Sequence, residues 1–228
     1  MKAVLAQLEN KGTAKGREGM ARYGIVAKKA YGVSVRDCQL IAKPFRHDHA
    51  LAQALFKTGW FEARLVAAFV DDPAVISAAE MQRWARAFEN WADCDTAVMH
   101  LFDQSPHAWP LTRKWCTAKP EFEKRAGFAM LASMALHHKD EPSAPFIKSL
   151  ALVEKASRDE RNFVKKAVNW ALRSIGSRDT ACHAAAMKRS AKLAASDDAT
   201  ARWIGKDALK QLDTAATRKR VARGDARA

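Results

Sequence analysis

The sequence lacks the signatures of several large classes of protein. No apolar run is long enough to cross a bilayer, and the first residues show neither the apolar core nor the cleavage site of a signal peptide. No glycine-rich phosphate loop, dinucleotide fingerprint or nucleophilic Ser or Cys triad motif is present. These absences argue against a membrane-spanning or secreted protein, and we expect a cytoplasmic location.

Cysteine is scarce as well. The four residues of this type are Cys38, Cys94, Cys116 and Cys182. None forms a Cys-x-x-Cys pair, no zinc spacing occurs, and each lies in an apolar pattern typical of a helix. We therefore expect buried, reduced thiols and no metal site.

Acidic residues are fewer than basic residues. The 228 residues include 39 Lys and Arg against 25 Asp and Glu, which gives a formal net charge of +14. The hydrophobic fraction of 48% is too high for a disordered chain and suits one domain or one repeat array. Such a basic balance favours a polyanionic partner, most often nucleic acid, although a generally basic soluble protein would show it too.

Strand signals are absent, and helical signals fill the chain. Strict alternation and Asn-Gly hairpin turns do not occur, whereas apolar residues recur at spacings of three and four. Ser77 and Glu80 form a capping box, which marks one helix start. About a dozen short helices with brief connections predict an all-α fold of stacked antiparallel helix pairs, an α-solenoid.

Three similar segments support a repeat. They begin at Phe61, Phe122 and Phe163, and the spacing of the last two lies within the HEAT-like period of roughly 40–47 residues. The first step is too long for one period, so we expect an irregular array. Each segment has a basic residue three positions after its Phe, namely Arg64, Arg125 and Lys166. On successive helices these residues would form a basic stripe along one concave surface.

Trp91 and Asp95 are the clearest candidates for a functional pair. They lie four residues apart in a helical pattern and so share one face. A Trp ring offers a flat, electron-rich surface to a base or a cation, whereas an Asp would repel a polyanion. Asn90 could instead cap a helix that starts at Trp91, and acids are favoured near its positive end for structural reasons alone. On the residues alone, both interpretations stay open.

The chain resembles the HEAT-like-repeat DNA alkylation-repair proteins, a family of alkylpurine DNA glycosylases. The matching stretches occur in family order, with near-family spacing, at residues 33–43, 55–64, 71–73, 90–95, 124–127 and 163–173.

The resemblance implies a role for each matching residue. The family's catalytic Asp falls on Asp95 and its base-facing Trp on Trp91, and a second aromatic wall maps to Trp170. Arg173 lies one turn after Trp170, and a backbone-contacting Arg maps to Arg125. The stretch between Arg125 and Trp170 is longer than we expect for the family, with an insertion around residues 138–142. The positions expected to contact DNA are Arg125, Arg173, Arg64, Lys166 and Arg36.

The resemblance also implies an activity and its setting. We expect a monomeric glycosylase that hydrolyses the N-glycosidic bond of cationic alkylated purines in double-stranded DNA, without a metal or an organic cofactor. A concave basic groove over residues 1–216 would wrap the duplex, and the protein would associate with the nucleoid when bound. Two alternatives remain: a non-catalytic HEAT-repeat binder of branched or distorted DNA, and a HEAT-repeat protein-interaction scaffold.

The last residues, 217–228, carry many basic residues and lack an apolar face. The sequence predicts a mobile basic tail there that adds non-specific attraction to phosphates.

Overall fold

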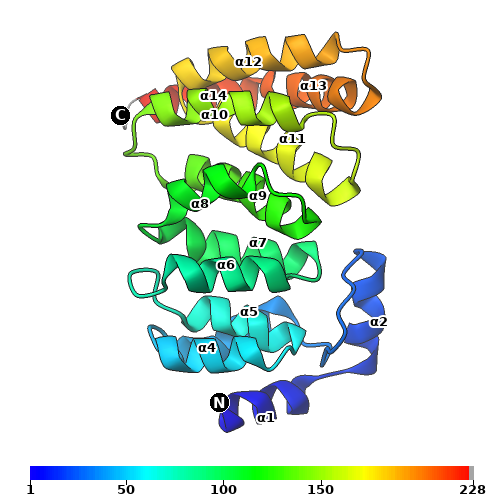
Figure 1. The fold of residues 1–228 in the computed structure, drawn as a ribbon, viewed down its shortest axis with the longest axis vertical. Helices are drawn as coiled ribbons and strands as arrows, with labels where there is room; N and C mark the ends of the chain where they lie inside the picture. Colours follow the sequence, from blue (N-terminus) through cyan, green and yellow to red (C-terminus); the bar gives the residue numbers. More distant parts are fainter. Residues whose placement is uncertain (226–228) are drawn as a thin grey trace. The chain divides into compact units, whose positions relative to one another are not determined.

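The fold is all-α, as the sequence predicts. The computed structural model describes residues 1–225, which contain fourteen α-helices, two 3₁₀ helices and no strand (Figure 1). No helix in that range is long and apolar enough to cross a membrane. The elements are, in order, α1 (Lys2–Lys11), α2 (Ala14–Arg22), α3 (Val35–Ala42), η1 (Lys43–Phe45), α4 (His49–Lys57), α5 (Phe61–Val70), α6 (Ala78–Ala87), α7 (Trp91–His100), η2 (Phe102–Gln104), α8 (Ala108–Trp115), α9 (Glu121–His137), α10 (Ser143–Ala156), α11 (Asn162–Gly176), α12 (Thr180–Ala194), α13 (Ala199–Leu212) and α14 (Ala215–Asp225).

The chain forms two compact units, Met1–Trp109 and Pro110–Ala228. In the first unit, α3, α5 and α7 pack in a row, and α4 packs on α5 as a second layer. Apolar side chains fill the space between the layers, and the rings of Phe56 and Trp84 stack at 4.1 Å between centroids. This arrangement of a helix row backed by partner helices is the HEAT-like architecture expected from the repeats.

The second unit repeats the same plan with longer helices. Its first row consists of α9, α11 and α13, while α10 and α12 lie in the second row and contact α11 and α13 (Figure 1). Helix α9 is buried on nearly all sides, since most residues from Glu123 to Ala135 are inaccessible to solvent. A helix in that position has no single apolar stripe, so its burial is not visible in the spacing of its apolar residues.

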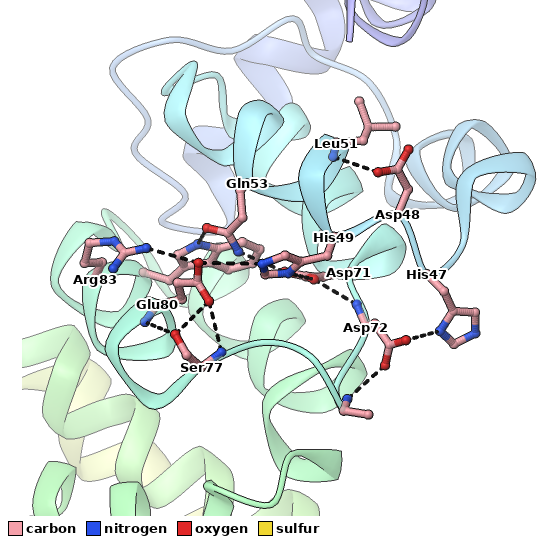
Figure 2. Close-up of polar contacts among 12 residues, drawn as sticks. His47, Asp48, His49, Leu51, Gln53, Asp71, Asp72, Ser77, Glu80 and Arg83 are labelled. Atoms are coloured by element: carbon pink, nitrogen blue, oxygen red, sulfur yellow. Dashed lines mark hydrogen bonds and ion pairs between the residues drawn. The ribbon is translucent and has the colours of Figure 1, made fainter.

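Several expected local features are present. The Ser77 hydroxyl accepts a hydrogen bond from the Glu80 N–H at 3.3 Å, and the Glu80 carboxylate accepts one from the Ser77 N–H at 3.0 Å, so the capping box is confirmed (Figure 2). All four cysteines are buried free thiols. Burial raises the pKa of the Cys116 thiol and keeps it protonated.

The chain end differs from the mobile tail expected for residues 217–228. Residues 217–225 belong to helix α14, and residues 226–228 lie outside the described part of the chain. Helix α14 buries Thr217 and Val221 and packs on α12 and α13. Two buried positions one helical turn apart anchor the helix, but a single apolar side chain among many basic ones is too weak a pattern to reveal this.

Two further contacts hold α14 at its end. Gly224 lies so close to the Arg178 carbonyl that an added Cβ would stand 1.9 Å from that oxygen. Next to it, the Asp225 carboxylate accepts hydrogen bonds from the backbone N–H of Thr180 at 2.9 Å and from its hydroxyl at 2.5 Å. These bonds lower the pKa of Asp225 and satisfy a free N–H in the first turn of α12.

We expect Gly224→Ala to loosen α14. The new methyl group would clash with the Arg178 carbonyl, and overpacking of this kind costs about 1–3 kcal/mol. Gly19→Ala is the matched control, because a Cβ there meets no atom within 4 Å, and the change should stabilise by up to about 1 kcal/mol. Urea unfolding and amide hydrogen exchange in residues 215–225 measure both effects. Equal protection of α14 in the two variants would contradict the packing described.

Candidate functional site

The N-terminus of α7 is built by a capping box that the residue order Asn-x-x-Asp encodes. The Asn90 side chain accepts hydrogen bonds from the N–H groups of Ala92 and Asp93, at 2.9 and 3.1 Å. In return the Asp93 carboxylate accepts from the N–H of Asn90 at 3.2 Å and of Glu89 at 3.1 Å. The capping interpretation is thus confirmed for Asn90 and Asp93. Asp95 lies outside this box, further along the helix.

Arg64 also supports the start of α7. Its guanidinium donates to the Ala87 carbonyl at 2.9 Å and approaches the Asp93 carboxylate at 3.4 Å. Its side chain is only 11% exposed and lies 5.2 Å from the centre of the Phe56 ring. Burial raises the pKa of Asp93 to about 6, although Arg64 and the capping N–H groups act in the opposite direction.

Hydrogen bonds hold the segment between α2 and α3 against α5 and α7. The buried Glu62 carboxylate accepts three backbone hydrogen bonds from the segment, from the N–H groups of Tyr31, Gly32 and Val33. The Trp91 indole N–H donates to the Tyr23 carbonyl at 2.8 Å. This bond fixes the orientation of the indole, because a Trp ring has a single polar atom with which to anchor itself.

Trp91 and Asp95 line one hollow of about 530 Å³ in the first unit, here called the Trp91 hollow. Its walls come from α2, α3, α5 and α7 and are mostly apolar, with contributions from Met20, Ile25 and Phe61. Asp95 is the one carboxylate among the residues that line it. The structure therefore brings together the indole and the acid that the sequence singles out, on the wall of one cavity.

A second hollow of about 720 Å³ adjoins the first, and His100 lines both. Its exposed cations are Arg36, Lys43 and Arg46, and we call it the Arg36 hollow. Within residues 1–225 none of these three cations forms an ion pair. Their charges are therefore available to an external anion.

The acids near the Arg36 hollow already have partners within the protein. Asp71 is fully buried, where its carboxylate contacts the His49 ring nitrogen at 2.7 Å and accepts from the Gln53 amide at 3.1 Å (Figure 2). Burial raises the pKa of Asp71. Asp72 lies 3.4 Å from the His47 ring, and His47 adopts a left-handed backbone with φ of 67°. These partners keep both acids from opposing the exposed cations.

The remaining expected site residues belong to the second unit. Trp170 and Arg173 of α11 line a recess of about 340 Å³, here called the Trp170 recess. Arg125 is buried, and its guanidinium donates to the Phe163 carbonyl at 2.8 Å. Lys166 is exposed on α11. Within this unit the structure brings Trp170 and Arg173 together.

The basic stripe expected from the three repeats differs from what the structure shows. The repeat segments do lie at the starts of α5, α9 and α11. However, Arg64 and Arg125 are turned inward and bind backbone carbonyls, whereas Lys166 is exposed. A buried guanidinium that satisfies a carbonyl stabilises the packing, and the spacing of basic residues does not distinguish it from a surface charge.

Comparison with protein families fits this architecture. A family model described as DNA alkylation repair enzyme matches residues 4–212, most of the chain. The chain belongs to the DNA alkylation repair enzyme family. No curated protein is similar enough to be matched.

One solved structure has a similar fold. It is described as belonging to "a new family of proteins related to the HEAT-like repeat DNA glycosylases with affinity for branched DNA structures". Its TM-score is 0.78 at 20% sequence identity, over 96% of this chain and 95% of that chain. At this identity the likeness shows the HEAT-like fold.

Sequence reasoning missed several residues of this member of the DNA alkylation repair family. Glu62 and the segment between α2 and α3 that it binds close one side of the Trp91 hollow. No residue spacing in the sequence indicates an acid that accepts three backbone hydrogen bonds. Lys43 begins the 3₁₀ helix η1 and Arg46 follows it, and neither carries a repeat signal. Among residues 1–225, no three His, Cys, Asp or Glu side chains gather as a metal site.

We expect Asp93 to make stability depend on pH. Because its pKa is raised to about 6 in the folded state, the stability it contributes is fully present below about pH 4 and is lost as pH rises through about 6. The shift of about two units corresponds to about 3 kcal/mol. Urea unfolding at pH 4 and pH 7 should show a larger loss for the wild type than for Asp93→Asn. Parallel pH profiles would contradict this environment for Asp93.

Proposed function

We propose that this protein is a DNA glycosylase that hydrolyses the N-glycosidic bond of cationic alkylated purines in duplex DNA. One observation carries the proposal: an indole and a carboxylate share the wall of an apolar hollow, in a chain of net charge +14. A carboxylate there is unfavourable for phosphate but favourable for a positive charge. Membership of the DNA alkylation repair family supports a substrate with such a charge.

Recognition would rest on the charge of the damaged base. Alkylation at N3 of adenine or N7 of guanine makes the purine cationic, and such a base is attracted to the face of an indole. A cation–π contact of this kind is worth about 0.5–2 kcal/mol. The Trp91 ring, fixed by its bond to the Tyr23 carbonyl, is suited to this contact. Neutral bases gain no such attraction, so damage is distinguished without reading base edges.

Hydrolysis would then need little more than a well-placed carboxylate. As the bond breaks, the base departs with the bonding electrons and becomes neutral, while positive charge develops on the sugar at C1′ and O4′. The Asp95 carboxylate stabilises that oxocarbenium-like charge. Water adds through its oxygen to C1′, and Asp95 accepts the proton that the water releases. The alkylated base supplies the leaving group itself, so no metal or organic cofactor enters the reaction.

Cations of both units would hold the DNA. Arg36 of the Arg36 hollow and Lys166 of the second unit are exposed, Arg173 is half-buried, and all three would bind phosphates. Trp170 would supply a second aromatic surface. We assign Arg64 and Arg125 an indirect role, since both support helix starts from inside the protein. The protein would act as a monomer in the cytoplasm and associate with the nucleoid through DNA.

A second function is favoured by a specific observation. The structurally similar protein is described as having affinity for branched DNA structures. A binder without catalysis would use the cations of both units but would gain nothing from Asp95. Base release decides between the two functions, because only the glycosylase liberates a purine.

We expect Asp95→Asn to slow base release strongly. Loss of the carboxylate removes both charge stabilisation and the proton acceptor, and removal of such groups lowers rates by about 10²–10³-fold. The measurement is release of methylated purine from alkylated duplex DNA under single-turnover conditions. Trp91→Phe keeps a ring but loses the bond to Tyr23, so a smaller decrease is expected.

Glu18→Gln is the matched control for Asp95→Asn. It removes one exposed carboxylate from α2 outside the Trp91 hollow and should leave the rate unchanged. Full activity of Asp95→Asn, or no release by the wild type, would contradict the proposed reaction.

We also expect the Arg36 hollow to bind phosphates. The double substitution Lys43→Gln with Arg46→Gln should weaken binding to any duplex sequence and reduce the slope of log K against log salt by about 2. Lys57→Gln with Arg86→Gln removes the same charge from exposed positions that line neither hollow. Fluorescence anisotropy between 50 and 200 mM salt measures both pairs. Equal slopes for the two double variants would show that only total charge matters.

A further inference from the structure

Helix α14 lies beyond the residues that the family model matches. The match covers residues 4–212, and α14 spans Ala215–Asp225. The helix is nevertheless part of the second unit, because Val221 is buried and Asp225 binds the start of α12. At its other end, the Thr214 hydroxyl accepts a hydrogen bond from the Thr217 N–H at 3.1 Å and so caps the first turn. These contacts hold the helix against α12 and α13.

This position brings Arg220 of α14 to the Trp170 recess. The recess is lined on one side by Trp170 and Arg173 of α11, and on the other by Thr217 and Arg220 of α14. Two guanidinium groups and one indole, from two helices, therefore line a single cavity. Its volume of about 340 Å³ lies within the range of small-ligand sites.

Positive charge around the recess is poorly balanced. Arg173 approaches Asp207 only to 3.9 Å, and its Nε is buried without a hydrogen-bond partner among the described residues. Arg220 forms no ion pair within residues 1–225. An anion bound at this place would relieve the repulsion among these cations.

We propose that α14 completes a binding site for one nucleotide of a DNA strand in the Trp170 recess. The phosphate would lie between Arg173 and Arg220, where guanidinium groups can donate paired hydrogen bonds. The base would stack on the Trp170 indole, and such stacking does not depend on sequence because every base has a π-face. The proposal rests on DNA binding by the proposed function, but not on the chemistry at Asp95.

A DNA strand accounts for the exposed Lys219 of α14 better than a free nucleotide does. A single phosphate would leave the exposed Lys219 of α14 unused, whereas a strand leaving the recess would extend to this further cation. Phosphate contacts of this type fix the position of a nucleic acid and carry no sequence preference.

The test compares two arginines of the same helix. Arg220→Gln should weaken binding of the full chain to fluorescein-labelled duplex DNA about tenfold at 100 mM salt and reduce the salt slope by about 1. Arg223→Gln removes the same charge from an exposed position that does not line the recess, and its effect should stay below twofold. Arg220→Lys should recover only part of the affinity, because an ammonium cannot donate in the paired geometry.

Each outcome has one meaning. Equal losses for Arg220→Gln and Arg223→Gln, or no loss for either, would overturn the site. Displacement of the labelled DNA by millimolar deoxynucleoside monophosphate, acting on wild type but not on Arg220→Gln, would overturn the strand in favour of a free nucleotide. A wild type that releases no base but loses affinity through Arg220→Gln would leave the recess intact and contradict only the proposed reaction.

Discussion

The buried carboxylate of Asp93 is the constraint on which the rest of the candidate site depends. It closes the capping box at the start of α7, accepts hydrogen bonds from Glu89 and Asn90, and meets Arg64 from α5. Without it, the N–H groups of Glu89 and Asn90 would lose their acceptor, and the Arg64 guanidinium would lose a contact with a carboxylate. Because the first turn is fixed, Trp91 can bind the Tyr23 carbonyl and Asp95 reaches the wall of the hollow.

Two acids only two residues apart therefore have different roles. Asp93 is directed inward and stabilises structure, whereas Asp95 lines a cavity of a strongly basic protein. In the first unit, exposed cations line the Arg36 hollow, whereas the inward-facing Arg64 donates to a backbone carbonyl. This separation would let phosphates be attracted from outside while the hollow retains one negative charge for a cation. The charge of the alkylated base, rather than its shape, would then select the substrate.

The sequence allowed the helical class and the Trp91–Asp95 pair to be predicted, because a spacing of four on a helix determines which residues share a face. It did not allow Arg64 or Arg125 to be separated from surface cations, since both interior and surface arginines occur at the same repeat position. Helix α14 was missed for a related reason. Its docking depends on a close approach at Gly224 and on Asp225 binding Thr180, and both are long-range contacts without a local pattern.

The most direct test of the candidate site is the affinity for a charged sugar analogue. A duplex with a cationic pyrrolidine in place of one nucleotide imitates the developing oxocarbenium ion, and a neutral tetrahydrofuran at the same position is its uncharged counterpart. We predict that the wild type prefers the cationic duplex by at least about tenfold, near 1.4 kcal/mol, and that Asp95→Asn loses the preference. An equal affinity of the wild type for both duplexes, or a preference that survives in Asp95→Asn, would contradict a role for Asp95 against positive charge.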